Sequence, residues 1–473
     1  MKKTLFTILA IAALVSACNT KENNAPDPEI KGVPFIATVQ SADDAYTRAV
    51  AESGGNITVD FNEGELIALV YEVGSYIYKT DAEITSVDGS GKATISATLQ
   101  AGVVDGTAVT LIYPSSVATA GGSVAPSALA TQDGTLSSAR DVRKGTGSIK
   151  VDGTATLAGG ATLDAQFAIC KFSVKDVDGT NDLSVSSFVV KDGDNNVITT
   201  VTPAPDASTL YVSLPTTTEL LWFEAVVDGK PYIAKGTASL TAGNFYTPTV
   251  KMATIMNVIG ANGKFYKNKD AAVAASTSAS AIIASLGEDT AETGYPHGLA
   301  IAMGISTGMT KKWKAEGTAS HTQYASYDLA LAAKESGSAL CVGKNDADNY
   351  PAFYAALNNS ITAAEGITSS KPSSGTSNWF LPSAYQMNLI IKGLIGTSAN
   401  LTDMDQTALL ATAVYYPIQA AGYVSAVPWN SNGNKVWTST EKSDGEAWTY
   451  VSSGKMGGIN KTYVAYVIAT LAF

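Results

Sequence analysis

The chain has 473 residues, of which 45% are hydrophobic and only 15% are charged, and its formal net charge is -11. At the usual size of roughly 150 residues per domain, this length predicts two or three hydrophobic cores, and a single domain is not expected. The acidic balance excludes the long-range attraction by which basic proteins bind nucleic acids or anionic membranes, so we expect no nucleic-acid partner.

Residues 1–17 have the layout of a secretory signal peptide. Lys2 and Lys3 precede a mostly apolar run from Leu5 to Val15. This run is too short to span a bilayer as a helix, so we expect it to be removed after export.

The five residues LVSAC, which end at Cys18, resemble a bacterial lipobox. The resemblance implies cleavage between Ala17 and Cys18 and lipidation of Cys18 by a diacylglyceryl group and a further acyl chain, such as palmitate. At about 0.8 kcal/mol per buried methylene, two or more chains hold a soluble protein at a membrane far longer than one chain does. Residues 18–32 are polar and contain prolines, which predicts a disordered, lipidated tether. An ordinary signal peptide followed by a chance cysteine is the alternative.

The region 33–254 is predicted to be an all-β antiparallel sandwich. Short β-branched runs alternate there with Gly, Asp and Asn, a pattern typical of strands and turns. The hairpin signal is strongest in LLWFEAVVDGKPYIAKG, with Asp228 and Gly229 at the turn. The predicted strands are VPFIATV, NITVDF, LIALVYEV, KATISATL, AVTLIYP, FAICKFSVK, SSFVVKDG, LYVSLP, LLWFEAV and YTPTVKM. The pattern leaves open whether they form one sandwich or two sub-domains.

The residue pattern changes in the region 255–473, which is predicted to be α+β. The segment SAYQMNLIIKGL predicts an amphipathic helix, because Met387, Ile390, Ile391 and Leu394 follow helical spacing and Ser383 with Gln386 forms a capping box. Further helices are predicted in QYASYDLALAAKE and in PAFYAALNNSITAAE. The last 26 residues again have a pattern typical of β-strands, with Gly457 and Gly458 predicted to form a turn.

Patterns that carry chemistry are weak in this sequence. GISTG would make Ser306 a hydrolase nucleophile only if a helix and an Asp and His pair followed, and the one later histidine is His321. We therefore expect no enzyme.

No metal and no cofactor are expected either. His297 and His321 are too few for a histidine-rich site, and Cys170 and Cys341 are predicted to be buried thiols in separate regions. The run DGDNN from Asp192 lacks the later ligands of a calcium loop and is interpreted as a hairpin turn. KNDADNYP, from Lys344 to Pro351, is interpreted as a solvated approach to a helix.

The first half resembles the fimbrillin-like (Mfa-like) lipoproteins of type V pili. The matching features are the lipobox, TRA at residues 47–49, FNEGELIAL at 61–69, TQDGTL at 131–136, LYVSLP at 210–215 and TAGNFYTPTVKM at 241–252. The resemblance implies processing between Arg48 and Ala49, departure of the strand VPFIATV, and filling of the vacated groove by a donor strand of another pilin subunit. The whole chain has only two other arginines, Arg140 and Arg143. The alternative is that Arg48 is an uncut loop residue.

The second half resembles the C-type-lectin-like domains of bacterial surface proteins, through NWFLPSAYQMNLI and VWTSTEKSDGEAW. In such folds large aromatic residues fix long loops from beneath. Trp379, Trp437 and Trp448 are therefore expected to lie in the core, whereas Trp429, with Asn430 and Asn432, is the predicted ligand-binding surface. The triplets that ligate calcium in sugar-binding relatives are missing here.

The sequence thus predicts a fimbrial tip subunit of the outer membrane and cell surface. It would accept a donor strand through its N-terminal region and present an adhesin-like region to a host or bacterial glycan or protein. The alternative is a non-polymerising outer-membrane lipoprotein that binds such a ligand while tethered through Cys18.

Overall fold

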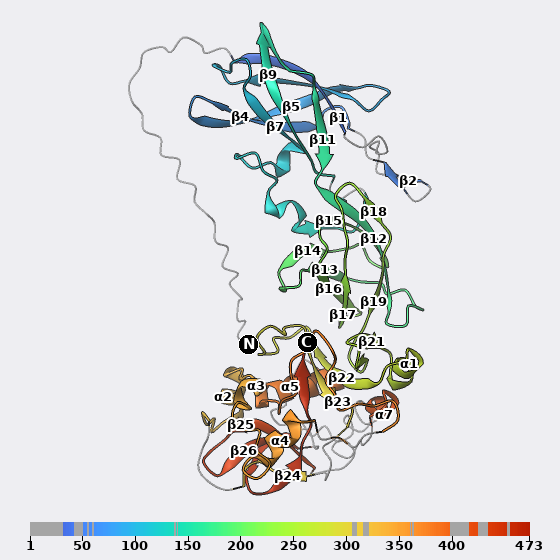
Figure 1. Ribbon diagram of the computed structural model, residues 1–473, viewed down its shortest axis with the longest axis vertical. Helices are drawn as coiled ribbons and strands as arrows, with labels where there is room; N and C mark the ends of the chain where they lie inside the picture. Colours follow the sequence, from blue (N-terminus) through green and yellow to red (C-terminus); the bar gives the residue numbers. More distant parts are fainter. Residues whose placement is uncertain are drawn as a thin grey trace, which may run out of the picture.

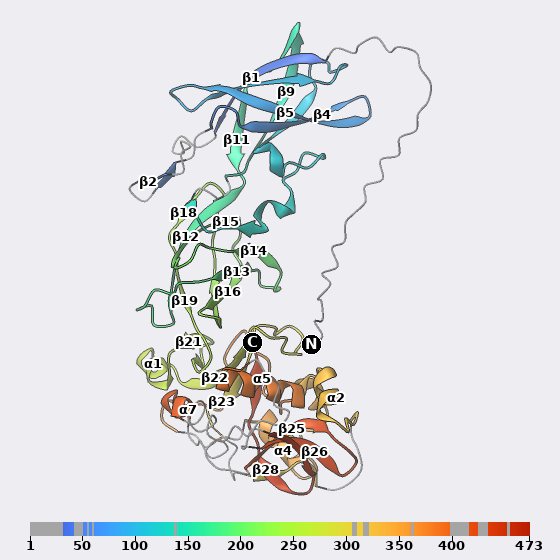
Figure 2. The same cartoon turned by 180° about the vertical axis from the view of Figure 1, so that it is seen from behind.

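The protein is described by a computed structural model that covers residues 32–41, 51–53, 56–58, 61–136, 139, 141–304, 310–315, 321–359, 361, 364–397, 416–423, 434–451 and 455–473. For residues 51–53 and 56–58 the description is of the backbone. The molecule is elongated and has three parts stacked along its long axis (Figures 1 and 2). We call them the N-terminal barrel, the central sandwich and the C-terminal region.

The N-terminal barrel is a closed sheet around one apolar core. Its strands are β1 (Val33–Ser41), β4 (Leu66–Val73), β5 (Tyr76–Val87), β6 (Ala93–Leu99), β7 (Ala108–Tyr113), β9 (Arg143–Asp152), β10 (Thr154–Leu157) and β11 (Ala161–Ala165). They are hydrogen-bonded in the order β10-β1-β11-β9-β7-β4-β5-β6, and β6 pairs back to β1. Closure therefore runs through β1. Strands β2 (Ala51–Ser53) and β3 (Asn56–Thr58) form a separate hairpin.

The central sandwich has two sheets, one of the order β17-β16-β13-β14-β8 and one in which β12 pairs with β15, β18 and β19. Its strands are β8 (Thr131–Gln132), β12 (Phe167–Asp176), β13 (Ser187–Lys191), β14 (Val197–Val201), β15 (Thr209–Pro215), β16 (Leu220–Val227), β17 (Lys230–Thr237), β18 (Phe245–Tyr246) and β19 (Thr249–Met252). The rings of Phe172, Phe188 and Phe223 contact one another in the core. The core of the sandwich is separate from that of the barrel.

The chain crosses from barrel to sandwich and back before it finally enters the sandwich. Between β7 and β9 it forms two short 3-10 helices, η1 (Ser115–Val117) and η2 (Pro126–Leu129), and then β8. Buried Gln132 on β8 donates to the Thr199 hydroxyl at 3.1 Å and to the Ser213 carbonyl at 3.0 Å. These bonds fix the crossover to the core of the sandwich.

Most predicted strands of the front half are confirmed, as is the hairpin turn at Asp228 and Gly229. Both turn residues have positive φ, 49° and 73°, as a two-residue hairpin turn requires. The run from Asp192 is also a hairpin turn, because its carboxylate accepts from the backbone of Asp194 and Asn196. Strand β9 was not predicted, since Gly145 and Gly147 interrupt its apolar pattern.

The C-terminal region combines helices with two sheets of the orders β21-β20-β22-β23-β29 and β24-β28-β25-β26-β27. Its strands are β20 (Val258–Gly260), β21 (Phe265–Tyr266), β22 (Ala279–Leu286), β23 (Gly298–Ala302), β24 (Thr310–Lys312), β25 (Lys435–Glu441), β26 (Glu446–Val451), β27 (Lys455–Asn460), β28 (Val464–Tyr466) and β29 (Thr470–Ala472). Its helices are α1 (Lys269–Ala274), α2 (Tyr327–Ala332), α3 (Gly337–Leu340), α4 (Pro351–Leu357), α5 (Ala384–Ile395) and α7 (Tyr416–Ala420).

Helix α5 is confirmed in detail. The Ser383 side chain accepts from the Gln386 backbone and the Gln386 side chain accepts from the Ser383 backbone, which is the predicted capping box. The helix ends at Gly396, whose φ of 71° is left-handed. The four apolar residues of the predicted stripe are buried, and the helix packs on the fully buried strand β22.

The predicted core tryptophans are confirmed, and each fixes a loop or strand through its indole N–H. Trp437 donates to the Lys311 carbonyl at 2.7 Å, Trp448 to the Tyr324 carbonyl at 3.0 Å, and Trp379 to the Ser369 carbonyl at 3.0 Å. A fourth tryptophan, Trp313, is fully buried and donates to the Thr438 carbonyl at 2.7 Å.

The prediction of a turn at Gly457 and Gly458 is wrong, because both glycines lie inside β27. Gly458 pairs with Trp448 across the sheet. A Cβ at Gly458 would lie 2.3 Å from Cδ of Lys442, whose ammonium lies 5.7 Å from the centre of the Trp448 ring. Glycine is used here for space above the strand rather than for a turn.

Candidate functional site

Strand β1 closes the barrel and is hydrogen-bonded on both sides. It runs antiparallel to β6 through seven residue pairs, from Val33 with Leu99 to Val39 with Ala93. On its other side it runs parallel to β10 and to β11. Its neighbours β6, β10 and β11 all follow β1 in the chain. Strand β1 is therefore a single N-terminal strand that lies between two edges of the sheet.

The side chains of β1 alternate strictly between core and solvent. Phe35 and Val39 are each 1% exposed and Ala37 is 7% exposed, and all three belong to the barrel core. Ile36, which points the other way, is 51% exposed. The strand therefore supplies three apolar side chains to the barrel interior, as a strand with one buried face does.

A buried ion pair fixes the C-terminal end of β1. Arg143 is 2% exposed, and its Nε donates to the Asp141 carboxylate at 2.9 Å. Its Nη1 donates to the Ser41 hydroxyl at the last residue of β1. Because Arg143 is buried, an arginine-specific protease has no access to it in the folded barrel.

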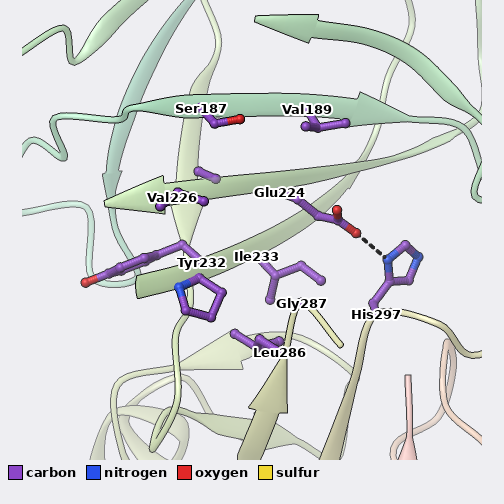
Figure 3. Close-up of a pocket in the computed structure, with 11 residues that line it drawn as sticks. Ser187, Val189, Glu224, Val226, Tyr232, Ile233, Leu286, Gly287 and His297 are labelled. Carbon is purple, nitrogen blue, oxygen red and sulfur yellow. Dashed lines mark hydrogen bonds and ion pairs between the residues drawn. The ribbon is translucent and has the colours of Figure 1, made fainter. Parts of the chain in front are cut away.

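A second polar cluster joins the central sandwich to the C-terminal region (Figure 3). Glu224 on β16 points toward His297, which precedes β23, and the two side chains are 3.1 Å apart. Lys191 forms an ion pair with the same carboxylate at 2.7 Å. On its own, burial raises the pKa of Glu224, but the hydrogen bonds from His297 and Lys191 outweigh it and hold that pKa below its ordinary value.

His297 is buried and stacks on the Trp222 ring at a centroid distance of 3.8 Å. Its hydrogen-bond partner, Glu224, lies in the sandwich and not in the turn that contains His297. The cavity beside it, of about 220 Å³, is lined by the sandwich and by Leu286 and Gly287 of the C-terminal region. Nothing in the sequence could pair residues 73 positions apart, so the junction was not predicted.

The predicted processing and ligand residues lie outside the described residues. This applies to Ala17, Cys18, Arg48, Ala49, Trp429, Asn430, Asn432 and the rejected nucleophile Ser306. By sequence, Arg48 follows Ser41, the end of β1, by seven positions. The structure thus places the strand that the processing hypothesis concerns, and the cut site stays a prediction.

Within the described ranges, no group of three or more His, Cys, Asp or Glu side chains is arranged to hold a metal ion. Asp346 of the predicted helix approach caps its own turn by accepting from Asp348 and Asn349. Cys170 and Cys341 are buried free thiols, and burial raises the pKa of each to about 12. None of the helices described here is both long and apolar enough to cross a membrane.

No protein-family model and no curated protein matches the sequence. Among solved structures, the chain is similar to a fimbrial protein from Bacteroides ovatus at 13% identity, with 94% of this chain and 99% of that chain covered and a TM-score of 0.32. It is also similar to candidate cell adhesion proteins from Bacteroides fragilis and Bacteroides uniformis. The B. fragilis protein shares 12% identity, with 47% of this chain and 96% of that chain covered and a TM-score of 0.30. The B. uniformis protein shares 12% identity, with 48% of this chain and 98% of that chain covered and a TM-score of 0.28.

Proposed function

We propose that this protein is a cell-surface fimbrial adhesion subunit whose barrel accepts a donor strand in place of β1. The observation that carries the proposal is the position of β1, a single N-terminal strand inserted between β6 on one side and β10 and β11 on the other. A cut in the segment after Ser41, at Arg48, would free this strand without breaking any other strand of the barrel.

The energetics favour replacement rather than an empty slot. Full exposure of an aromatic or branched apolar side chain costs about 1.5–3 kcal/mol, and β1 contributes two of these, Phe35 and Val39, together with Ala37. Loss of β1 would also leave two strand edges without partners, which promotes pairing with another extended segment. A donor strand with small or branched residues at alternate positions would restore both the apolar contacts in the core and the hydrogen bonds at the two edges.

The C-terminal region is proposed to be the adhesin-like, C-type-lectin-like part, which binds a surface glycan or protein through the loop that contains Trp429, Asn430 and Asn432. We propose a tip position for the subunit. In the C-terminal region, β29 pairs with β23 and Phe473 is 1% exposed. These residues are thus built into the region and are not available as a donor strand. Before maturation, the lipid on Cys18 would hold the subunit at the outer membrane.

N-terminal sequencing of the surface-exposed protein tests this proposal. We expect the mature protein to begin at Ala49, and Arg48→Ala to leave the protein with its N-terminus at Cys18 and outside the fibres. Glu72→Ala is the control, because Glu72 is an exposed residue of β4, outside the segment that would be cut. A mature wild-type protein that always begins at Cys18 would overturn the proposal.

One observation favours the alternative of a permanently tethered, non-polymerising lipoprotein. Arg143 holds Ser41, so the end of β1 that lies nearest to the cut is tied to the barrel by a buried side chain. If β1 stays in place after cleavage at Arg48, the chain would remain closed and would bind its ligand as a monomer. Size-exclusion chromatography of the cleaved protein with and without a synthetic β1 peptide separates the two functions.

A further inference from the structure

The central sandwich contains a wedge between strands β17 and β19, which is independent of β1 and of processing at Arg48. Where the wedge begins, Ile233 of β17 and Ala253, just after β19, exchange two backbone hydrogen bonds of 2.8 and 2.7 Å. Beyond this bridge the two strands separate. Figure 1 shows β17 and β19 side by side at the end of the sandwich nearest the C-terminal region.

Both edges of the wedge carry backbone groups that have no hydrogen-bond partner in the part of the chain that the structure describes. In an antiparallel ladder the groups that face one neighbour alternate with those that face the other. Since Ile233 faces Ala253, the N–H and C=O of Lys235 and Thr237 also point away from β16 and toward the wedge.

The same alternation holds on β19. The N–H of Ser173 on β12 donates to the Pro248 carbonyl, just before β19. This hydrogen bond and the parallel register fix which residues of β19 face β12. The N–H and C=O of Thr249 and Lys251 therefore face the wedge. Among the described residues, neither these groups nor those on β17 have a hydrogen-bond partner.

The floor of the wedge is an apolar cavity of about 450 Å³. Aromatic rings of Phe172 and Phe223 lie in this floor, and the β17 residues on the same face of the strand are Ala234 and Gly236. A Cβ at Gly236 would meet no heavy atom within 4 Å, and Gly236 is exposed. The cavity is thus open at the position where a larger residue on β17 would have filled it.

Two facing rows of unpaired backbone groups select a peptide over a lipid or another apolar small molecule. An acyl chain would cover the floor but would bury donors and acceptors without partners, at about 1–3 kcal/mol each. An extended peptide satisfies both edges and places alternate side chains over the floor.

The charges at the wedge select an acidic peptide. Lys235 and Lys251 line the cavity from opposite strands, and within the described part of the chain neither forms an ion pair with a carboxylate. The Lys251 ammonium donates to the Asp178 carbonyl at 3.3 Å, while that of Lys235 lies 5.2 Å from the Trp222 ring centre. Burial lowers the pKa of Lys235, so a neighbouring carboxylate would be favourable to it.

We propose that the wedge between β17 and β19 is a strand-binding site for an extended segment of a partner protein, with small apolar residues at alternate positions and carboxylates between them. The segment would pair with Lys235 and Thr237 on one side and with Thr249 and Lys251 on the other. It would give the protein a second protein contact that needs neither cleavage nor loss of β1.

Fluorescence anisotropy of the full chain with labelled nine-residue peptides tests the proposal. The probes are a peptide of alternating valine and glutamate, one of alternating valine and lysine, and a scrambled valine and glutamate peptide. We expect the first to bind about tenfold tighter than either of the others, a difference of about 1.4 kcal/mol. Equal binding of the glutamate and lysine peptides would overturn the proposal.

The site itself is tested by Gly236→Phe, which places a ring in the wedge, with Gly89→Phe as the matched control. A Cβ at either glycine meets no atom within 4 Å, and neither has a left-handed φ. We expect Gly236→Phe to weaken binding about tenfold or more and Gly89→Phe to leave it unchanged. Binding that survives Gly236→Phe would place the peptide elsewhere and end the proposal.

A charge reversal provides a variant that does not depend on packing. Lys251 is exposed, so the Lys251→Glu protein is expected to fold normally. We expect it to bind the glutamate peptide more weakly and the lysine peptide more tightly than wild type does. Should Gly236→Phe fail to fold, this result decides alone. An unchanged preference for the glutamate peptide would then exclude the wedge.

Discussion

At the scale of single residues, the polar side chains of this protein are used to hold its parts together. Each of the four described tryptophans of the C-terminal region donates its indole N–H to a backbone carbonyl of another segment. Glu224 accepts from both Lys191 and His297 and so connects β13, β16 and the start of β23. Buried aromatic and charged groups thus make contacts between segments that are far apart in the sequence.

Glu224→Gln is expected to reduce the dependence of stability on acid pH. The folded-state pKa of Glu224 is lower than its ordinary value of 4.5, so the carboxylate stabilises the fold above about that pH. This contribution is lost as the pH falls through the lowered pKa. Urea unfolding between pH 3 and pH 6 should show wild type losing more stability than the variant toward pH 3. Glu72→Gln, on an exposed side chain, is the control, and parallel losses in Glu224→Gln and wild type would contradict the prediction.

At the scale of elements, α5 is the helix that the sequence describes most completely and also one that packs unusually closely. Its cap and its apolar stripe are local features, and both were predicted from residue spacing. The role of Gly393 was not readable. A Cβ there would lie 2.0 Å from the Ala284 carbonyl oxygen, so only glycine allows the helix to approach β22.

Gly393→Ala is therefore expected to destabilise the protein although alanine is the better helix former. Helix propensity favours alanine by about 1 kcal/mol, whereas overpacking against a backbone carbonyl costs about 1–3 kcal/mol or displaces the helix. We expect a net loss of up to about 2 kcal/mol in the free energy of unfolding, measured by urea denaturation. Gly445→Ala, whose Cβ meets no atom within 4 Å, should change stability little. A more stable Gly393→Ala protein would contradict the close approach.

At the scale of the whole molecule, the two junctions between parts differ in size. Trp222, Ile233 and Ala253 of the sandwich side belong to the same apolar cluster as the core of the C-terminal region. The junction between barrel and sandwich is a small cluster around Ile112 and Val142, against which Phe167 packs. We therefore expect the sandwich and the C-terminal region to be coupled in unfolding through this shared cluster.

Trp222→Ala is expected to loosen both sides of the larger junction. Removal of a buried tryptophan costs about 3–5 kcal/mol, and His297 loses its stacking partner. Hydrogen exchange should rise in β16 and β17 and also in β23, while the barrel strands β4 and β7 stay protected. Tyr76→Ala, on a side chain that is 71% exposed, is the control and should leave β23 unchanged. A rise confined to the sandwich would show that the two parts unfold separately.

The sequence by itself determined the elements whose information is local. Alternation of apolar and polar residues predicted β1 and most strands of the front half, and spacing with a capping box predicted α5. The tertiary structure alone decided that β1 closes a barrel, that Gly458 lies in a strand, that His297 meets Glu224, and that β17 and β19 diverge over a cavity. These features depend on contacts between residues far apart in the chain, and periodicity along a sequence contains no information about which distant faces will meet.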